Sequence, residues 1–317
     1  MAGGFGKNLR PLLSNIQLNM AHEHHHHHHH APDHLNRAFL WGIGLNIAFV
    51  AAEAGAGLYY GSLGLLSDAG HNLSDVVSLI LALIAFRLAL IKPSETYTYG
   101  YKKSTILVSL LNAVILLVAV GFILAECIEK LRHPQPIEGG VIAWVAGIGI
   151  VINGITAWLF FKDRSHDLNV KGAFLHMAAD TLVSVGVLLS GVIISYTGWY
   201  IIDPVIGLVI AIIILYSTWD LLHDSLRLSL DGIPANIDRK EIESLLLADP
   251  RVVEVHHLHI WAISTTQNAL TAHIVVGSFD DAESLKHDLR HRLQEMNIQH
   301  ATFELERPGE HCHADCC

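Results

Sequence analysis

The sequence has little charge. Of its 317 residues, 16% are Asp, Glu, Lys or Arg, whereas roughly 25% are charged in typical soluble domains. Half of the residues are hydrophobic and the mean hydropathy is +0.40. This composition indicates a membrane protein whose surroundings are the lipid bilayer. The net charge of −10 and the lack of a basic stripe argue against nucleic acid as a partner.

Cysteine is also scarce. Cys127 ends an apolar run, and the other three cysteines fall within the last six residues. This spacing excludes a disulfide framework for a core. It indicates reduced thiols on a cytosolic tail, residues 311–317, in which Cys312 and Cys316 are candidate ligands for a soft metal. The polar first thirty residues lack the basic-then-apolar pattern of a cleavable signal peptide.

Histidine, by contrast, is abundant: 23 residues outnumber the 20 lysines and arginines. Seven are consecutive, His24–His30, in a His-rich tail that we assign to residues 1–36 and to the cytosol. The run is either a native low-complexity metal-binding tract or an engineered purification tag. Acidic and histidine residues flank it without a cleavage linker, which favours the native tract.

Six apolar segments follow, each near the ~20 residues that cross a bilayer as a helix. They cover approximately 37–60, 64–91, 104–130, 139–161, 168–197 and 200–226. We therefore expect an all-α six-helix transmembrane domain over residues 37–226. An even number of crossings places both termini on one side. Lysines and arginines in the second-to-third and fourth-to-fifth connections indicate that this side is the cytosol.

Residues 227–310 have the composition of a soluble domain. Helical spacing over 237–248 is followed by alternating strands over 252–264 and 269–277, an amphipathic helix over 280–296 and a short strand over 302–306. The order α-β-β-α-β predicts a small cytosolic α+β domain with helices packed on a sheet. A domain of this size would gain stability by pairing with a second copy, so it is expected to dimerise.

Two stretches carry ionisable residues into the apolar segments. Both have the pattern His-x-x-x-Asp: His71 with Asp75, and His176 with Asp180. Residues four apart share one face of a helix. A charge at the bilayer centre costs at least ~2.5 kcal/mol, so such residues indicate a function. Two facing helices would offer two nitrogens and two oxygens, which suits four-coordinate Zn²⁺.

Two alternatives stay open for these pairs. Each pair can form an intrahelical hydrogen bond that neutralises itself, or the four ligands can hold a structural zinc ion. Asp68 lies on the same stripe as His71 and Asp75, among small residues. This arrangement favours an open route for the metal, with Asp68 as an approach residue rather than a ligand. Other polar residues of the segments, Glu53 among them, line that route or pair helices.

Several motifs together resemble the cation diffusion facilitator family. They are the stretch Ser67–Asp75, the second His-x-x-x-Asp pattern, Asp203-Pro204 and the strand sequence His256–Trp261. The resemblance extends over residues 37–306. Both patterns begin with histidine, and in this respect the sequence resembles the zinc branch of the family, which includes bacterial exporters. It implies a homodimer of six-helix protomers in the bacterial inner membrane that exchange cytosolic Zn²⁺ for protons by alternating access. The positions that match the family's transport site are His71, Asp75, His176 and Asp180.

In the soluble domain the resemblance implies zinc ligands near the dimer interface. The matching positions are His256, His273, His300 and Glu306. Zn²⁺ would then be a regulatory ligand as well as the cargo. On a regular strand His257 and His259 share one face and His256 points to the opposite face. Solvated surface histidines are the alternative interpretation.

Proton exchange also follows from the ligand chemistry. Metal binding requires neutral imidazole and ionised carboxylate, so protons and metal compete for the same atoms, with His71 and His176 as proton carriers. The predicted function is therefore a non-enzymatic secondary transporter that exports zinc, with cadmium, cobalt or nickel as further cargoes. A metal-sensing or metal-storage membrane protein is the alternative. An intramembrane metalloprotease would need a pattern such as His-Glu-x-x-His, which neither stretch supplies.

Overall fold

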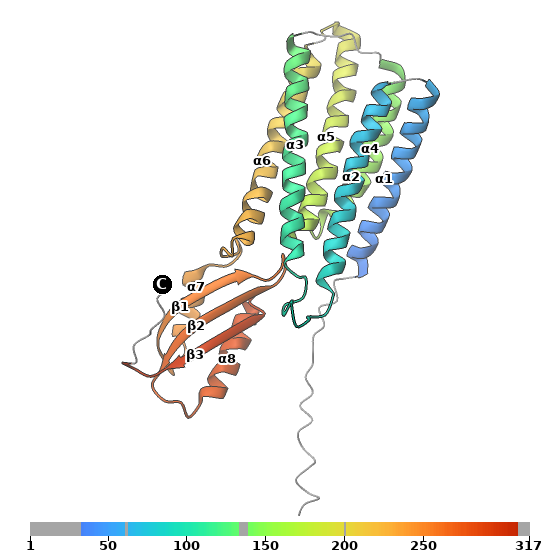
Figure 1. Cartoon of the computed structure of the whole chain (residues 1–317). Coiled ribbons are helices and arrows are strands. Elements are labelled where there is room, and N and C mark those ends of the chain that lie inside the picture. Colours follow the sequence, from blue (N-terminus) through green and yellow to red (C-terminus); the bar gives the residue numbers. More distant parts are fainter. Residues whose placement is uncertain (1–32, 61–62, 133–138, 200, 310–317) are drawn as a thin grey trace, which may run out of the picture.

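The computed structural model describes residues 33–60, 63–132, 139–199 and 201–309, apart from some side chains within the helices. Six long helices form a bundle, and a small α+β domain lies beyond one end of it (Figure 1). The helices are α1 (Asp33–Tyr60), α2 (Leu63–Ala89), α3 (Ser104–Arg132), α4 (Gly139–Phe161), α5 (Leu168–Thr197) and α6 (Ile202–Ser229). They occupy the six apolar segments that the sequence predicts to be helical.

Three of these helices are, over the described residues, long and apolar enough to cross a membrane. The stretches are Arg37–Ala56 in α1, Ser104–Arg132 in α3 and Pro204–Ser229 in α6. A shorter apolar stretch, Gly147–Phe161, lies in α4. The chain is thus a membrane protein by composition. Helices α2 and α5 carry the two His-x-x-x-Asp patterns.

Helix α5 lies at the centre of the packing. One buried cluster joins it to α1, α2 and α4 through Phe39, Leu79, Phe160 and Met177, and a second cluster joins it to α3 and α6. Gly186 permits the close approach of α5 to α6, because a Cβ there would lie 2.4 Å from the Cδ1 atom of Ile210. Small residues at such contacts let membrane helices pack tightly.

The soluble domain consists of α7 (Arg239–Leu247), β1 (Val252–Ala262), β2 (Asn268–Val276), α8 (Ala282–Glu295) and β3 (His300–Glu306). The sheet order is β1-β2-β3, with β1 antiparallel and β3 parallel to β2. Apolar residues of α7, α8 and all three strands form one core, so both helices pack on the same face of the sheet. No described helix covers the opposite face.

Strand β1 contains a bulge that the regular alternation does not predict. From the pair His256–His273 to the pair His259–Thr271, β1 advances three residues and β2 only two. His257 takes up the extra residue with φ = 47°. Val255 and Leu258 consequently both pack against the core. The expectation that His256 and His257 point to opposite faces is therefore wrong.

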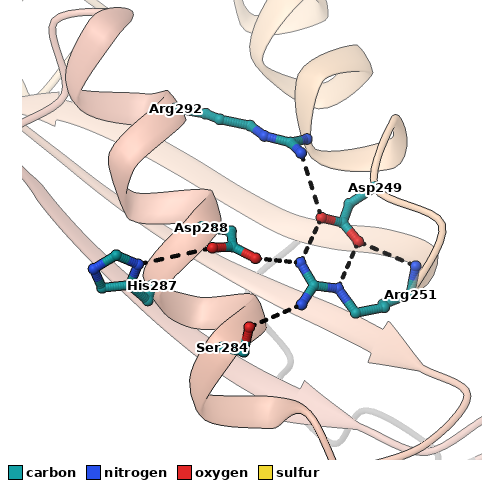
Figure 2. Close-up of polar contacts among 6 residues, drawn as sticks. All are labelled: Asp249, Arg251, Ser284, His287, Asp288 and Arg292. Atoms are coloured by element: carbon teal, nitrogen blue, oxygen red, sulfur yellow. Dashed lines mark hydrogen bonds and ion pairs between the residues drawn. The ribbon is translucent and has the colours of Figure 1, made fainter.

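An ion-pair network ties the start of β1 to α8 (Figure 2). Arg251 donates from Nε and Nη2 to the two carboxylate oxygens of Asp249, each at 2.9 Å, and from Nη2 to Asp288 at 2.7 Å. Arg292 lies 3.7 Å from the same Asp249 carboxylate, which is 2% exposed. Hydrogen bonding from Arg251 lowers the pKa of Asp249 to about 2. The network fixes the helical layer against the sheet.

Hydrogen bonds connect the hairpin between β1 and β2 to the bundle. Asp167 caps α5 by accepting from the backbone N–H groups of Asn169 and Val170, at 2.7 and 3.2 Å. The other oxygen of Asp167 accepts from the hydroxyl of Thr265 at 2.6 Å, and the Thr265 N–H donates to Thr105. The tip of the hairpin is thus bonded to the first turn of α5 and to α3.

Candidate metal centres

The bundle encloses a cluster of two carboxylates and one imidazole. The Nδ1 atom of His176 lies 3.1 Å from a carboxylate oxygen of Asp75 and 3.8 Å from one of Asp180. Ligand atoms of all three residues lie within 4.8 Å of one another. The Asp75 and His176 side chains are 0% and 4% exposed. Helix α2 supplies Asp75, and α5 supplies the other two residues one turn apart.

The second nitrogen of the His176 ring faces a hydroxyl. Its Nε2 atom lies 3.5 Å from the Oγ atom of Ser78, which is buried on α2 one turn beyond Asp75. A ring that donates from Nε2 to Ser78 keeps the Nδ1 lone pair directed at the two carboxylates. Histidines that bind metal are commonly oriented in this way by a partner on the other nitrogen. Ser78 was not among the residues singled out by the sequence.

Two further predicted residues of this region lie outside the described side chains. His71 and Asp68 belong to α2, but the structure does not describe their side chains. Three of the four predicted transport-site residues are therefore brought together, and the position of the fourth, the imidazole of His71, stays a prediction. Nearby, Asn72 donates to the buried carboxylate of Glu53 at 2.7 Å and joins α2 to α1.

The soluble domain holds a second cluster on the uncovered face of its sheet. Glu306 lies between two imidazoles: one oxygen is 2.6 Å from Nδ1 of His273, and the other is 3.1 Å from Nε2 of His256. Ligand atoms of these three residues also lie within 4.8 Å of one another. The opposite nitrogen of His273, Nε2, lies 3.3 Å from Glu304. Strand pairing sets this arrangement, since His256 is opposite His273.

The structure does not bring His300 into this cluster. His300 begins β3, where it pairs with Ala269, whereas Glu306 ends the strand beside Val275. Six strand residues separate the two positions by roughly 20 Å. The His300 ring instead packs at nearly a right angle to the ring of Tyr99, with centroids 5.7 Å apart. The tail residues Cys312 and Cys316 lie outside the described residues, so their metal binding stays a prediction.

Both clusters contain the donors that zinc prefers. Imidazole nitrogens and carboxylate oxygens bind borderline divalent ions in four-coordinate sites. Mg²⁺ and Ca²⁺ prefer six or more oxygens, which neither cluster offers. The cluster in the bundle is enclosed by helices, and the one in the soluble domain lies on a sheet surface.

Comparison with known sequences agrees with this geometry. The sequence profile of the cation efflux transmembrane domain matches residues 40–228, and that of the cation efflux protein cytoplasmic domain matches residues 234–307. The first contains the cluster in the bundle. The second contains the cluster on the sheet.

Three curated relatives have similar identity along nearly their whole length. The zinc transporter ZitB of Escherichia coli K12 is 35% identical over 302 residues, which cover 94% of this chain and 96% of that protein. The cadmium, cobalt and zinc/H(+)-K(+) antiporter of Bacillus subtilis is 35% identical over 81% of this chain and 85% of its own length. The metal cation efflux system protein CzcD of Cupriavidus metallidurans is 36% identical over 90% and 89%.

The profiles and the relatives together cover the motifs that indicated a cation diffusion facilitator, and they confirm that resemblance. The relatives are named as transporters and efflux proteins. The bundle and the sheet domain occur here in the same order as the two matching profiles. The chain belongs to the cation efflux family.

Proposed function

We propose that this protein exports Zn²⁺ from the cytosol in exchange for protons, by alternating access. The observation that carries the proposal is the buried cluster of Asp75, His176 and Asp180, where two carboxylates face one imidazole inside a helical bundle. Placing such groups among apolar helices is costly unless they bind a cation. Relatives named as a zinc transporter and as an antiporter that uses H⁺ support the same activity.

The exchange follows from competition for the same atoms. Zn²⁺ binds to the unprotonated Nδ1 of His176 and to the ionised carboxylates of Asp75 and Asp180, with His71 as the proposed fourth ligand. Protons that reach the site from outside occupy these atoms and displace the ion. A return of the protonated site to the cytosolic side then releases the protons and readmits zinc. Cadmium, cobalt and nickel are secondary cargoes of the same donor set.

We further propose six membrane crossings, α1 to α6, in the bacterial inner membrane with both termini in the cytosol. The loop between α2 and α3 carries Lys92, Lys102 and Lys103, and the loop between α4 and α5 carries Lys162 and Arg164, which supports this orientation. The protein acts as a homodimer, held partly through its soluble domain. In that domain His256, His273 and Glu306 bind zinc as a regulatory ligand.

The decisive experiment measures zinc uptake into inside-out vesicles under an imposed pH gradient. Asp75→Asn and Asp180→Asn preserve side-chain shape and remove the charge, and both should abolish uptake. Glu126→Gln serves as the matched control, because this carboxylate is 65% exposed on α3 and pairs with Lys130. Unchanged uptake in both aspartate variants would contradict the transport site. An uptake rate that does not depend on the pH gradient would contradict proton exchange. Zinc binding without uptake would favour a sensor or storage protein.

A further inference from the structure

Three imidazoles gather on the uncovered face of the sheet, with His257 in the place predicted for His300. Ring centroids of His256 and His273 lie 5.4 Å apart, those of His256 and His257 5.3 Å, and those of His257 and His273 4.9 Å. The nearly equal sides describe a triangle. His259, the next histidine along β1, lies farther out, 6.5 Å from His257.

This triangle has the dimensions of three histidines around one tetrahedral ion. With Zn–N near 2.0–2.1 Å, the centre of each imidazole lies about 3.2 Å from the metal, and tetrahedral angles then separate the centres by about 5.2 Å. All three separations in the sheet fall within a few tenths of an ångström of that value. Glu306 contacts two of the three rings, those of His256 and His273.

The backbone at His257 is bent in a way that produces this arrangement. The other described non-glycine residues with positive φ, Asp231 and Asn297, lie in turns, whereas His257 lies inside a strand. The bulge removes His257 from the regular alternation and places its ring beside His273. Bulges commonly redirect a side chain at functional sites.

Hydrogen bonding points to the same use of the ring. The Nδ1 atom of His257 is buried and has no hydrogen-bond partner among the described residues. A buried nitrogen without a partner costs free energy, which coordination of a metal would recover.

We propose that His257 is the fourth protein ligand of the zinc site formed with His256, His273 and Glu306. The ion binds to one nitrogen of each imidazole and to one oxygen of Glu306, while Glu304 accepts the N–H of His273 from the other side. Four protein ligands leave no open position, as in structural rather than catalytic zinc sites. The inference rests on the proposed zinc binding of the soluble domain and assigns the residue that closes the site.

The test measures the zinc affinity of the purified full-length protein by competition with a chromophoric chelator. His257→Asn is the informative variant, because Asn tolerates positive φ better than Ala does. It should weaken binding of one ion by more than about tenfold, since even residues that only hydrogen-bond to a metal ligand contribute about 10–100-fold to the affinity. His287→Ala, whose side chain on α8 is 83% exposed, should leave binding unchanged.

A double variant separates one shared ion from two independent ions. His257→Asn combined with His273→Ala should lose one zinc ion, the same ion that His273→Ala alone weakens. If His257→Asn keeps the parent affinity while His273→Ala loses it, the proposed zinc site stands and His257 is not a ligand. If neither variant changes the affinity, zinc binding by this cluster is itself refuted. Circular dichroism of each variant verifies that the fold is retained.

Discussion

The two clusters use the same kinds of donor in different proportions. In the bundle, two carboxylates face one described imidazole, and in the sheet, Glu306 faces two imidazoles, with His257 as the proposed third. With neutral imidazoles the described ligands carry two negative charges in the first cluster and one in the second. Zn²⁺ therefore neutralises the cluster in the bundle, whereas the cluster in the sheet stays positively charged when it holds the ion.

This difference suits the two proposed roles. Two protons neutralise the two carboxylates of the bundle as completely as one zinc ion does, so either occupant crosses a low-dielectric region at low electrostatic cost. In the sheet, zinc leaves the imidazole nitrogens when protons bind to these nitrogens or when a competing chelator binds the ion. The first arrangement favours exchange, and the second favours retention.

The sharpest test of this comparison replaces one histidine in each cluster. His176→Ala should lower zinc transport in proteoliposomes by more than about 100-fold, because it removes a ligand of the transported ion. Loss of a ligand costs more than loss of a residue that only hydrogen-bonds to a ligand, which costs about 10–100-fold. His273→Ala should leave transport at saturating zinc within a few-fold of the parent. Equal losses in the two variants would show that the clusters do not have separate roles.

The next largest effect concerns the stability of the soluble domain. Arg251→Ala removes the charged hydrogen bonds to Asp249 and Asp288 and should cost about 2 kcal/mol of unfolding free energy. For a domain of this size the melting temperature should fall by about 10 °C, as followed by circular dichroism in detergent. Arg239→Ala is the control, because its salt bridge on α7 is solvent-exposed.

The same network sets a pH dependence of stability. The pKa of Asp249 is lowered from 3.8 to about 2 in the folded chain. The stabilisation is therefore present above pH 4 and is lost as the pH falls from about 4 to 2. Arg251→Ala should flatten this part of the stability profile. An unchanged profile in the variant would contradict the assignment to Asp249.

The smallest effect tests how the imidazole of the bundle is held. Ser78→Ala removes the hydroxyl 3.5 Å from Nε2 of His176 and should reduce zinc affinity by about tenfold. The change should raise KM for zinc with little effect on the maximal rate at high zinc. Ser78→Thr retains a hydroxyl and should restore most of the affinity. An Ala variant with an unchanged KM would exclude an orienting role for Ser78.

Much of the fold could be predicted, because long apolar runs broken by Gly, Pro and charged residues specify helices without reference to their neighbours. The His-x-x-x-Asp patterns likewise specify one helical face each, and this is sufficient to place His176 beside Asp180. Ser78 could not be identified in this way. Its contact with His176 exists only after α2 packs against α5.

The strands were harder to predict, because register depends on pairing. His300 and Glu306 lie on one short strand, and only the parallel register with β2 shows that Glu306, and not His300, reaches His273. The bulge at His257 had a signal in the sequence. Val255 and Leu258 are both apolar at an odd spacing, which a regular strand cannot place on one face.

The bond between Thr265 and Asp167 has a mechanical consequence. Asp167 caps the N-terminus of α5. His176 and Asp180 lie on the same continuous helix, about 14 and 20 Å from this cap. The hairpin that bears Thr265 also continues directly into the strands of the face that is proposed to bind zinc. If α5 tilts to turn His176 and Asp180 from one side of the membrane to the other, the sheet must move with it, or the hydrogen bond between Thr265 and Asp167 must break.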